Sequence, residues 1–103
     1  MDGVKRTFYA GGVGYEWLTE ALARLRDIES QEVTQVLSAR RRLPLAAESA
    51  GVHFLTISGR TVDGRPLVVA VRLLGGHRQQ IIGAREMTPD ELVRFKAWEA
   101  DAS

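Results

Sequence analysis

Arginine is the residue type in this sequence with the clearest chemical potential, because it is frequent and concentrated in one part of the chain. Arginines make up all but two of the 14 basic residues. A guanidinium group stays charged and can donate two parallel hydrogen bonds to a phosphate or a carboxylate. Between residues 40 and 78 seven arginines stand against two acids, a local charge of +5. The seven are Arg40, Arg41, Arg42, Arg60, Arg65, Arg72 and Arg78. This segment could bind a polyanion, or it could be an ordinary solvated basic surface.

Acidic residues dominate the two segments that flank this basic part. Five acids stand against two basic residues between Glu16 and Glu32, and the same is true between Glu86 and Asp101, so each segment carries a charge of −3. We expect both segments to be helical. Their charge predicts a surface for a basic segment of a partner, although it could also simply balance the arginines.

Residues that could transfer a proton near neutral pH are scarce. His53 and His77 are the two histidines, and each could equally be an exposed or capping residue at the end of a strand or in a turn. The sequence contains no cysteine, no metal-ligand spacing and no nucleophile-elbow motif, so we expect neither a metal nor another cofactor. Gly11, Gly12 and Gly14 lack the ending of a phosphate-binding loop, and we expect a tight turn there that needs positive φ.

Length and composition indicate one domain that spans residues 1–103. The chain has 103 residues, of which 45% are hydrophobic and 26% are charged, values typical of a soluble globular protein. No apolar run is long enough for a membrane span, and the N-terminus lacks the apolar stretch of a secretion signal. The absence of cysteine adds to the expectation of a cytoplasmic protein.

The apolar periodicity predicts an α+β fold with a small antiparallel sheet and the order β-α-α-β-β-β-α. The predicted strands are Lys5–Ala10, His53–Arg60, Pro66–Leu74 and Arg78–Ala84, and the predicted helices are Tyr15–Ile28, Ser30–Leu37 and Thr88–Ala100. Asp63-Gly64 and Gly75-Gly76 predict tight turns, so the last three strands should form an antiparallel meander. No regular element is predicted for Ser38–Gly51, where Pro44 disfavours a helix.

The final helix has the most specific local signal. Thr88 is a predicted N-cap, Pro89 occupies the first helical position, and Glu91 completes a capping box. Leu92, Phe95 and Trp98 recur at three-residue steps and should face inward. We expect this helix to pack over the sheet and close the domain.

The segment from Ile57 to Leu92, ISGRTVDGRPLVVAVRLLGGHRQQIIGAREMTPDEL, resembles the C-terminal half of BrnT-like toxins. The shared features are Gly-Arg at a strand end, Asp-Gly-Arg in the turn, Leu-Val-Val-x-Val in the next strand, and Ile-Ile-x-Ala-Arg-x-Met-Thr-x-x-Glu before the last helix. The earlier part, from Thr7, is similar more loosely. The resemblance implies a RelE/BrnT-like fold and a metal-independent ribonuclease. It also implies that the chain is the toxin of a type II toxin–antitoxin pair.

The same resemblance implies partners and individual roles. The partners are RNA, on the ribosome or free, and a DNA-binding antitoxin, in a complex that can hold more than one copy of the chain. Arg85 matches the arginine of the Ala-Arg motif, which would hold the scissile phosphate, and Arg60 matches an arginine at the preceding strand end. Arg26 stands where the family commonly carries a histidine.

Metal-free RNA cleavage needs charge stabilisation at the phosphorane and proton transfer at two oxygens. Arginines can supply only the first of these functions, which leaves His53, with His77 or a desolvated Glu86, for the second. The residues expected to bind RNA are Arg40, Arg41, Arg42, Arg72, Arg78 and His77. Two alternatives stay open: a non-catalytic, partner-binding relative of the same fold, and a ligand-binding or assembly domain whose arginines pair with a partner's acids.

Overall fold

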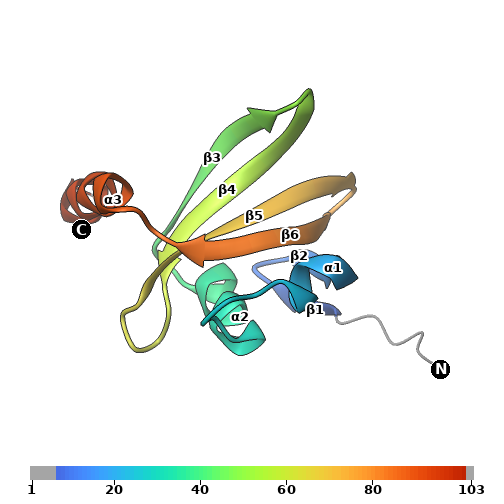
Figure 1. The fold of residues 1–103 in the computed structure, drawn as a ribbon, viewed down its shortest axis with the longest axis horizontal. Coiled ribbons are helices and arrows are strands. Elements are labelled where there is room, and N and C mark those ends of the chain that lie inside the picture. Colours follow the sequence, from blue (N-terminus) through green and yellow to red (C-terminus); the bar gives the residue numbers. More distant parts are fainter. Residues whose placement is uncertain (1–6, 102–103) are drawn as a thin grey trace.

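The computed structural model describes residues 7–101 and contains a six-stranded mixed sheet with three helices (Figure 1). In chain order the elements are β1 (Thr7–Ala10), β2 (Val13–Trp17), α1 (Thr19–Ala23), α2 (Ser30–Ser38), β3 (Arg42–Ser49), β4 (Val52–Arg60), β5 (Pro66–Gly75), β6 (Arg78–Glu86) and α3 (Pro89–Asp101). The strand order is β1-β2-β6-β5-β4-β3. Strands β2 and β6 are parallel, and all other neighbours are antiparallel. The predicted α+β class and the β4-β5-β6 meander are confirmed, but the sheet is larger than predicted and is not purely antiparallel.

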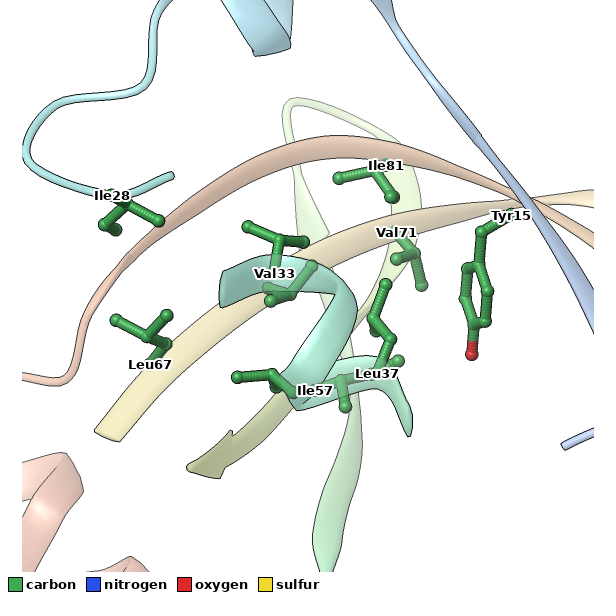
Figure 2. Close-up of a cluster of buried hydrophobic side chains, with 10 residues drawn as sticks. Tyr15, Ile28, Val33, Leu37, Ile57, Leu67, Val71 and Ile81 are labelled. Atoms are coloured by element: carbon green, nitrogen blue, oxygen red, sulfur yellow. The ribbon is translucent and has the colours of Figure 1, made fainter. Parts of the chain in front are cut away.

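One face of the sheet carries the core, and we call it the covered face. Helix α2 packs there because Val33, Val36 and Leu37 lie on one side of it and are fully buried, as predicted. They contact alternate residues of the central strands (Figure 2). The sheet residues of this core are Tyr15, Ile57, Leu67, Val69, Val71 and Ile81. Helix α1 packs against β6.

The predicted first helix, Tyr15–Ile28, is wrong over most of its length. Its first residues belong to β2, and the helix itself spans only Thr19–Ala23. The reason is a two-residue alternation: Tyr15 and Trp17 point into the core, whereas Glu16 between them faces the other side of the sheet. Gly11 and Gly12 have φ values of 59° and 82°. The expected positive-φ turn is therefore present, but it joins two strands. Lys5 and Arg6 of the predicted first strand lie outside the described residues.

The segment predicted to lack regular structure contains β3, an edge strand of eight residues. Pro44 is tolerated because an edge strand has one side on which no backbone N–H is needed. Helix α2 also differs in detail from its prediction. Its N-cap is Glu29 rather than Ser30, and Glu29 forms a capping box with Glu32.

Helix α3 begins as predicted, since Thr88 and Glu91 form the reciprocal capping box with distances of 2.8 and 3.2 Å. It does not close the domain, however. It lies at the end of the sheet where β6 ends and β3 begins, and it leaves much of the second sheet face uncovered (Figure 1). Within residues 7–101, no helix is both long and apolar enough for a membrane span.

Candidate functional site

The second face of the sheet, which we call the open face, presents a shallow hollow. The strand register places Thr56, Ala70 and Gly83 side by side, and next to them Ser58, Val68 and Arg85. Because Ala70 and Gly83 have little or no side chain, the sheet surface is hollowed at this point. The hollow has a volume of about 310 Å³. Phe54 lines one side of the hollow and Arg85 lines another. The hollow is therefore an apolar floor with a single guanidinium group at its edge.

Arg85 is held by the first turn of α3. Its Nη1 and Nη2 donate to Oε1 and Oε2 of Glu91 at 2.6 and 2.8 Å, and Nη1 also donates to the carbonyl oxygen of Glu86 at 3.1 Å. The Arg85 hydrogen bonds are the main reason that the pKa of Glu91 falls to about 2, and the same pair raises the pKa of Arg85. The Arg85 side chain is still 54% exposed, so its guanidinium group is both permanently charged and accessible.

Arg60 is held in the same way by the last turns of α3. Its Nε and Nη2 donate to the two carboxylate oxygens of Glu99, both at 2.9 Å, and its Nη1 donates to the carbonyl oxygen of Gly64 at 3.0 Å. The guanidinium carbon lies 5.6 Å from the ring centre of Phe95. Hydrogen bonding to Glu99 raises the pKa of Arg60 and lowers that of Glu99. Arg60 is thus the more enclosed arginine of the two.

The spacing of α3 matches the spacing of these two arginines. Glu91, Phe95 and Glu99 follow each other at four-residue intervals and so lie on one side of the helix. Eight residues of α-helix span about 12 Å. Arg85 and Arg60 lie on β6 and β4, with β5 between them. Because Arg85 is level with Ser58 in the strand register, Arg60 lies two residues farther along β4, and the two backbone positions are roughly 12 Å apart. One side of a single helix therefore contacts both arginines, with Phe95 buried between the two ion pairs.

Two further predicted RNA-binding arginines lie on the open face near the β5–β6 turn. Arg72 donates to Oε1 of Gln80 at 2.7 Å, and Arg78 pairs with Glu16 at 2.6 Å. Arg78 and Arg85 are seven residues apart on β6, about 23 Å. His77 is exposed in the turn beyond Arg78. The open face thus carries arginines at both ends of the sheet with the apolar hollow between them.

The three consecutive arginines Arg40, Arg41 and Arg42 each have different neighbours. Arg41 donates to the carbonyl oxygen of Glu99 at 3.4 Å and so lies beside α3. Arg42 donates to the carbonyl oxygen of Ala39 at 2.9 Å and faces Tyr15. Burial raises the pKa of Tyr15, and the charge of Arg42 opposes this effect. Arg40 is exposed.

Two of the four predicted catalytic residues lie far from Arg85. Arg26 is exposed in the segment between α1 and α2, the two helices of the covered face. His53 is exposed near the β3–β4 turn, 4.0 Å from Glu48. Its position on β4 is seven residues from Arg60, about 23 Å. The structure therefore brings Arg60 and Arg85 together around α3 but leaves both Arg26 and His53 elsewhere.

Sequence reasoning missed the acidic partners of these arginines. Glu91 and Glu99 were visible in the spacing Glu91-x-x-x-Phe95-x-x-x-Glu99, which places two carboxylates and one aromatic ring on the same helix side. Glu86, the predicted alternative proton-transfer group, pairs with Arg65 at 2.7 Å, and Arg65 also binds Glu32 of α2 at 3.0 Å. Glu86 therefore lies on the covered face, away from the Arg85 side chain.

Comparisons of the chain with protein-family models and with curated proteins found no match. The resemblance to BrnT-like toxins accordingly stays a prediction that depends on the motifs between Ile57 and Leu92.

Proposed function

We propose that this protein is the toxin of a type II toxin–antitoxin pair with a RelE/BrnT-like fold, and that it binds and cleaves RNA on its open face in the cytoplasm without a metal. The observation that carries the proposal is the position of Arg85. This arginine is the motif residue expected to hold the scissile phosphate, and it lies at the edge of an apolar hollow on an arginine-bearing sheet.

The chemistry of the open face suits a single-stranded nucleic acid. Such ligands need cationic groups for their phosphates and apolar or aromatic surfaces for their bases. Arg85 and, at the other end of the sheet, Arg72 and Arg78 provide the cations, and Phe54 provides a ring beside the hollow. An RNA strand that runs along the open face would contact both ends and place bases over the hollow.

In this proposal Arg85 acts by charge stabilisation. The 2′-hydroxyl of RNA loses its proton and attacks the neighbouring phosphorus, and the phosphorane that forms gains negative charge; a guanidinium fork can donate to two of its oxygens. The P–O5′ bond then breaks, and the leaving 5′-oxygen takes up a proton. An arginine side chain is not deprotonated in a protein, so Arg85 cannot exchange protons during this reaction. Both histidines are distant, which means that the RNA itself or solvent must supply the proton transfers. We therefore expect a slow enzyme.

The second candidate function is a non-catalytic, partner-binding relative of the same fold. The observation in its favour is that Arg60 and Arg85 each already bind a carboxylate, while His53 lies far from both. In that case the same arginines would maintain α3 as a binding surface, and the DNA-binding antitoxin would be the partner.

Inducible expression of the chain in a bacterium tests the proposal. We expect growth arrest and loss of intact RNA with the wild-type chain, a complete loss of both effects with Arg85→Ala, and a partial effect with Arg85→Lys, which keeps the charge but not the fork. Arg94→Ala, which removes an exposed arginine of α3, is the control and should behave as wild type. Normal growth and intact RNA with a folded wild-type chain would instead favour the partner-binding relative.

A further inference from the structure

Helix α3 is attached through the buried side chain of Phe95 and through two ion pairs with Arg60 and Arg85, and the proposed function assigns these arginines to phosphates. We propose that α3 is a displaceable cover, in which the carboxylates of Glu91 and Glu99 occupy the positions that two RNA phosphates take when the helix moves away. This inference rests on the proposed function, because it concerns how RNA gains access to Arg85 and Arg60.

Carboxylate and phosphate groups compete for the same geometry. Each can accept two parallel hydrogen bonds from one guanidinium group. Both guanidinium groups are used in this manner by α3, with all four distances between 2.6 and 2.9 Å. An RNA phosphate cannot make a two-point contact with Arg60 while Glu99 holds its Nε and Nη2. A phosphate that approaches Arg85 meets the same obstacle at Nη1 and Nη2.

The attachment of α3 is weak enough to be exchanged. Among the residues of α3, all of which are described, only Phe95 is buried. The ion pairs are partly exposed to water, with 54% exposure for the Arg85 side chain and 31% for that of Arg60. Ion pairs in such positions contribute little net stability and are screened by salt. Helices with few buried apolar contacts open at lower free energy than the core of a domain.

Displacement of α3 would enlarge the binding surface. Ser58 pairs with Val68, and Val68 pairs with Arg85, so Ser58 and Val68 lie on the sheet between the two arginines and the hollow. The ring of Phe95 packs against Arg60. Movement of the helix uncovers Arg60 and leaves two arginines whose backbone positions are roughly 12 Å apart, next to the hollow. Arg41, whose Nη1 contacts the end of α3, would border the same surface.

RNA binding by the purified full-length chain tests this inference. The probe is a short, fluorescently labelled oligouridine, and the readout is fluorescence anisotropy at low salt. The double variant Glu91→Gln, Glu99→Gln weakens the hold of α3. The control is Glu20→Gln, Glu48→Gln, which removes two exposed glutamates from other elements, so the change in net charge is identical. We expect the first variant to bind roughly tenfold more tightly than the control, since a closed cover reduces the apparent affinity by the fraction of open molecules.

A second readout leaves the glutamates unchanged, so it does not depend on the stability of the glutamate variants. Trp98 lies on α3, with its ring centre 5.5 Å from that of Phe95, so its fluorescence reports the position of the helix. Saturating oligouridine should shift the emission of the wild-type chain, and Trp98→Phe should abolish the shift.

The outcomes separate the cover from the function. In one outcome RNA binds, the binding depends on Arg85, the Trp98 emission does not shift, and the glutamate double variant binds RNA no more tightly than the control. In that case α3 is not a cover, although the proposed function stands. If oligouridine binds to neither the wild-type chain nor the double variant, the cover and the proposed RNA-binding function both fail.

Discussion

Glu91 binds Arg85 and caps α3 with the same carboxylate: Oε1 accepts from Nη1 of Arg85 at 2.6 Å and from the backbone N–H of Thr88 at 2.8 Å. The start of the helix and the position of the arginine are therefore coupled. Protonation of Glu91 weakens both its hydrogen bond to the backbone N–H of Thr88 and its ion pair with Arg85. This coupling makes α3 sensitive to conditions that leave the core unaffected.

Acid should loosen α3 in a defined pH range. The pKa of Glu91 is about 2 in the folded protein, compared with an ordinary value of 4.5. A carboxyl group with a lowered folded pKa stabilises the folded state above its ordinary pKa, and this contribution is lost as the pH falls from about 4.5 towards about 2. The pKa of Glu99 is also lowered, mainly by Arg60, so its contribution changes in the same direction. Trp98 fluorescence in acid should follow this loss.

The control for the acid experiment is Glu91→Gln, in which the change of Trp98 fluorescence between about pH 4.5 and pH 2 should be much smaller. A carboxyl resonance of Glu91 that titrates near its ordinary value would show that the Arg85 pair does not hold in solution.

Phe95 should anchor α3 without supporting the rest of the fold. Its side chain is buried, but it lies outside the core cluster of the covered face. Truncation of a buried phenylalanine to alanine costs roughly 3–5 kcal/mol, and we expect the loss to fall on α3. In the Phe95→Ala variant, the backbone amides of α3 should exchange their hydrogens faster than in the wild-type chain, whereas those of β4, β5 and β6 should exchange at the wild-type rate. Val93→Ala, an exposed position on the same helix, should change stability by less than about 0.5 kcal/mol. Faster exchange in β5 of Phe95→Ala would show that α3 is part of the core.

Gly59 allows α2 to approach the sheet. A Cβ atom at this position would lie 3.1 Å from Cγ1 of Val36. We expect Gly59→Ala to destabilise the domain by about 1 kcal/mol through overpacking. In a double-mutant cycle with Val36→Ala, which removes the contacting methyl group, the penalty of Gly59→Ala should shrink. Equal penalties in both backgrounds, measured by urea unfolding, would mean that the contact is not the cause.

The parts of the fold that could be predicted are those in which local signals agree. Asp63-Gly64 and Gly75-Gly76 mark two turns, and the strands between them have β-branched residues, so the β4-β5-β6 meander follows from the sequence. The Thr88-Glu91 capping box likewise fixes the start of α3. In β2, by contrast, Trp17 fits a helical period with Ala21 and Leu25 as well as a strand period with Tyr15, and only pairing with β6 decides between the two. Strand β3 carries a proline and weak alternation, and it is stabilised by pairing with β4.

The candidate site could be predicted only in part. The motif around Arg85 marks this residue, but no local pattern shows that Arg60 lies two strands away on the same face. This proximity depends on the register of β4, β5 and β6. The opposite error arose for His53, where the residue type suggested proton transfer although its strand position is remote from Arg85. Long-range register, rather than residue type, determines which groups meet.

The most direct test of the RNA-binding account is an amide chemical-shift map of the isotopically labelled chain with short oligouridine at low salt. We expect the largest changes on the open face, at Thr56, Ala70 and Gly83, and we expect them to disappear in Arg85→Ala. The amides of Val33 and Leu37 in α2, beneath the covered face, should not move. The absence of any change, or changes concentrated around Arg26 and Arg65, would contradict the assignment of the open face as the RNA-binding surface.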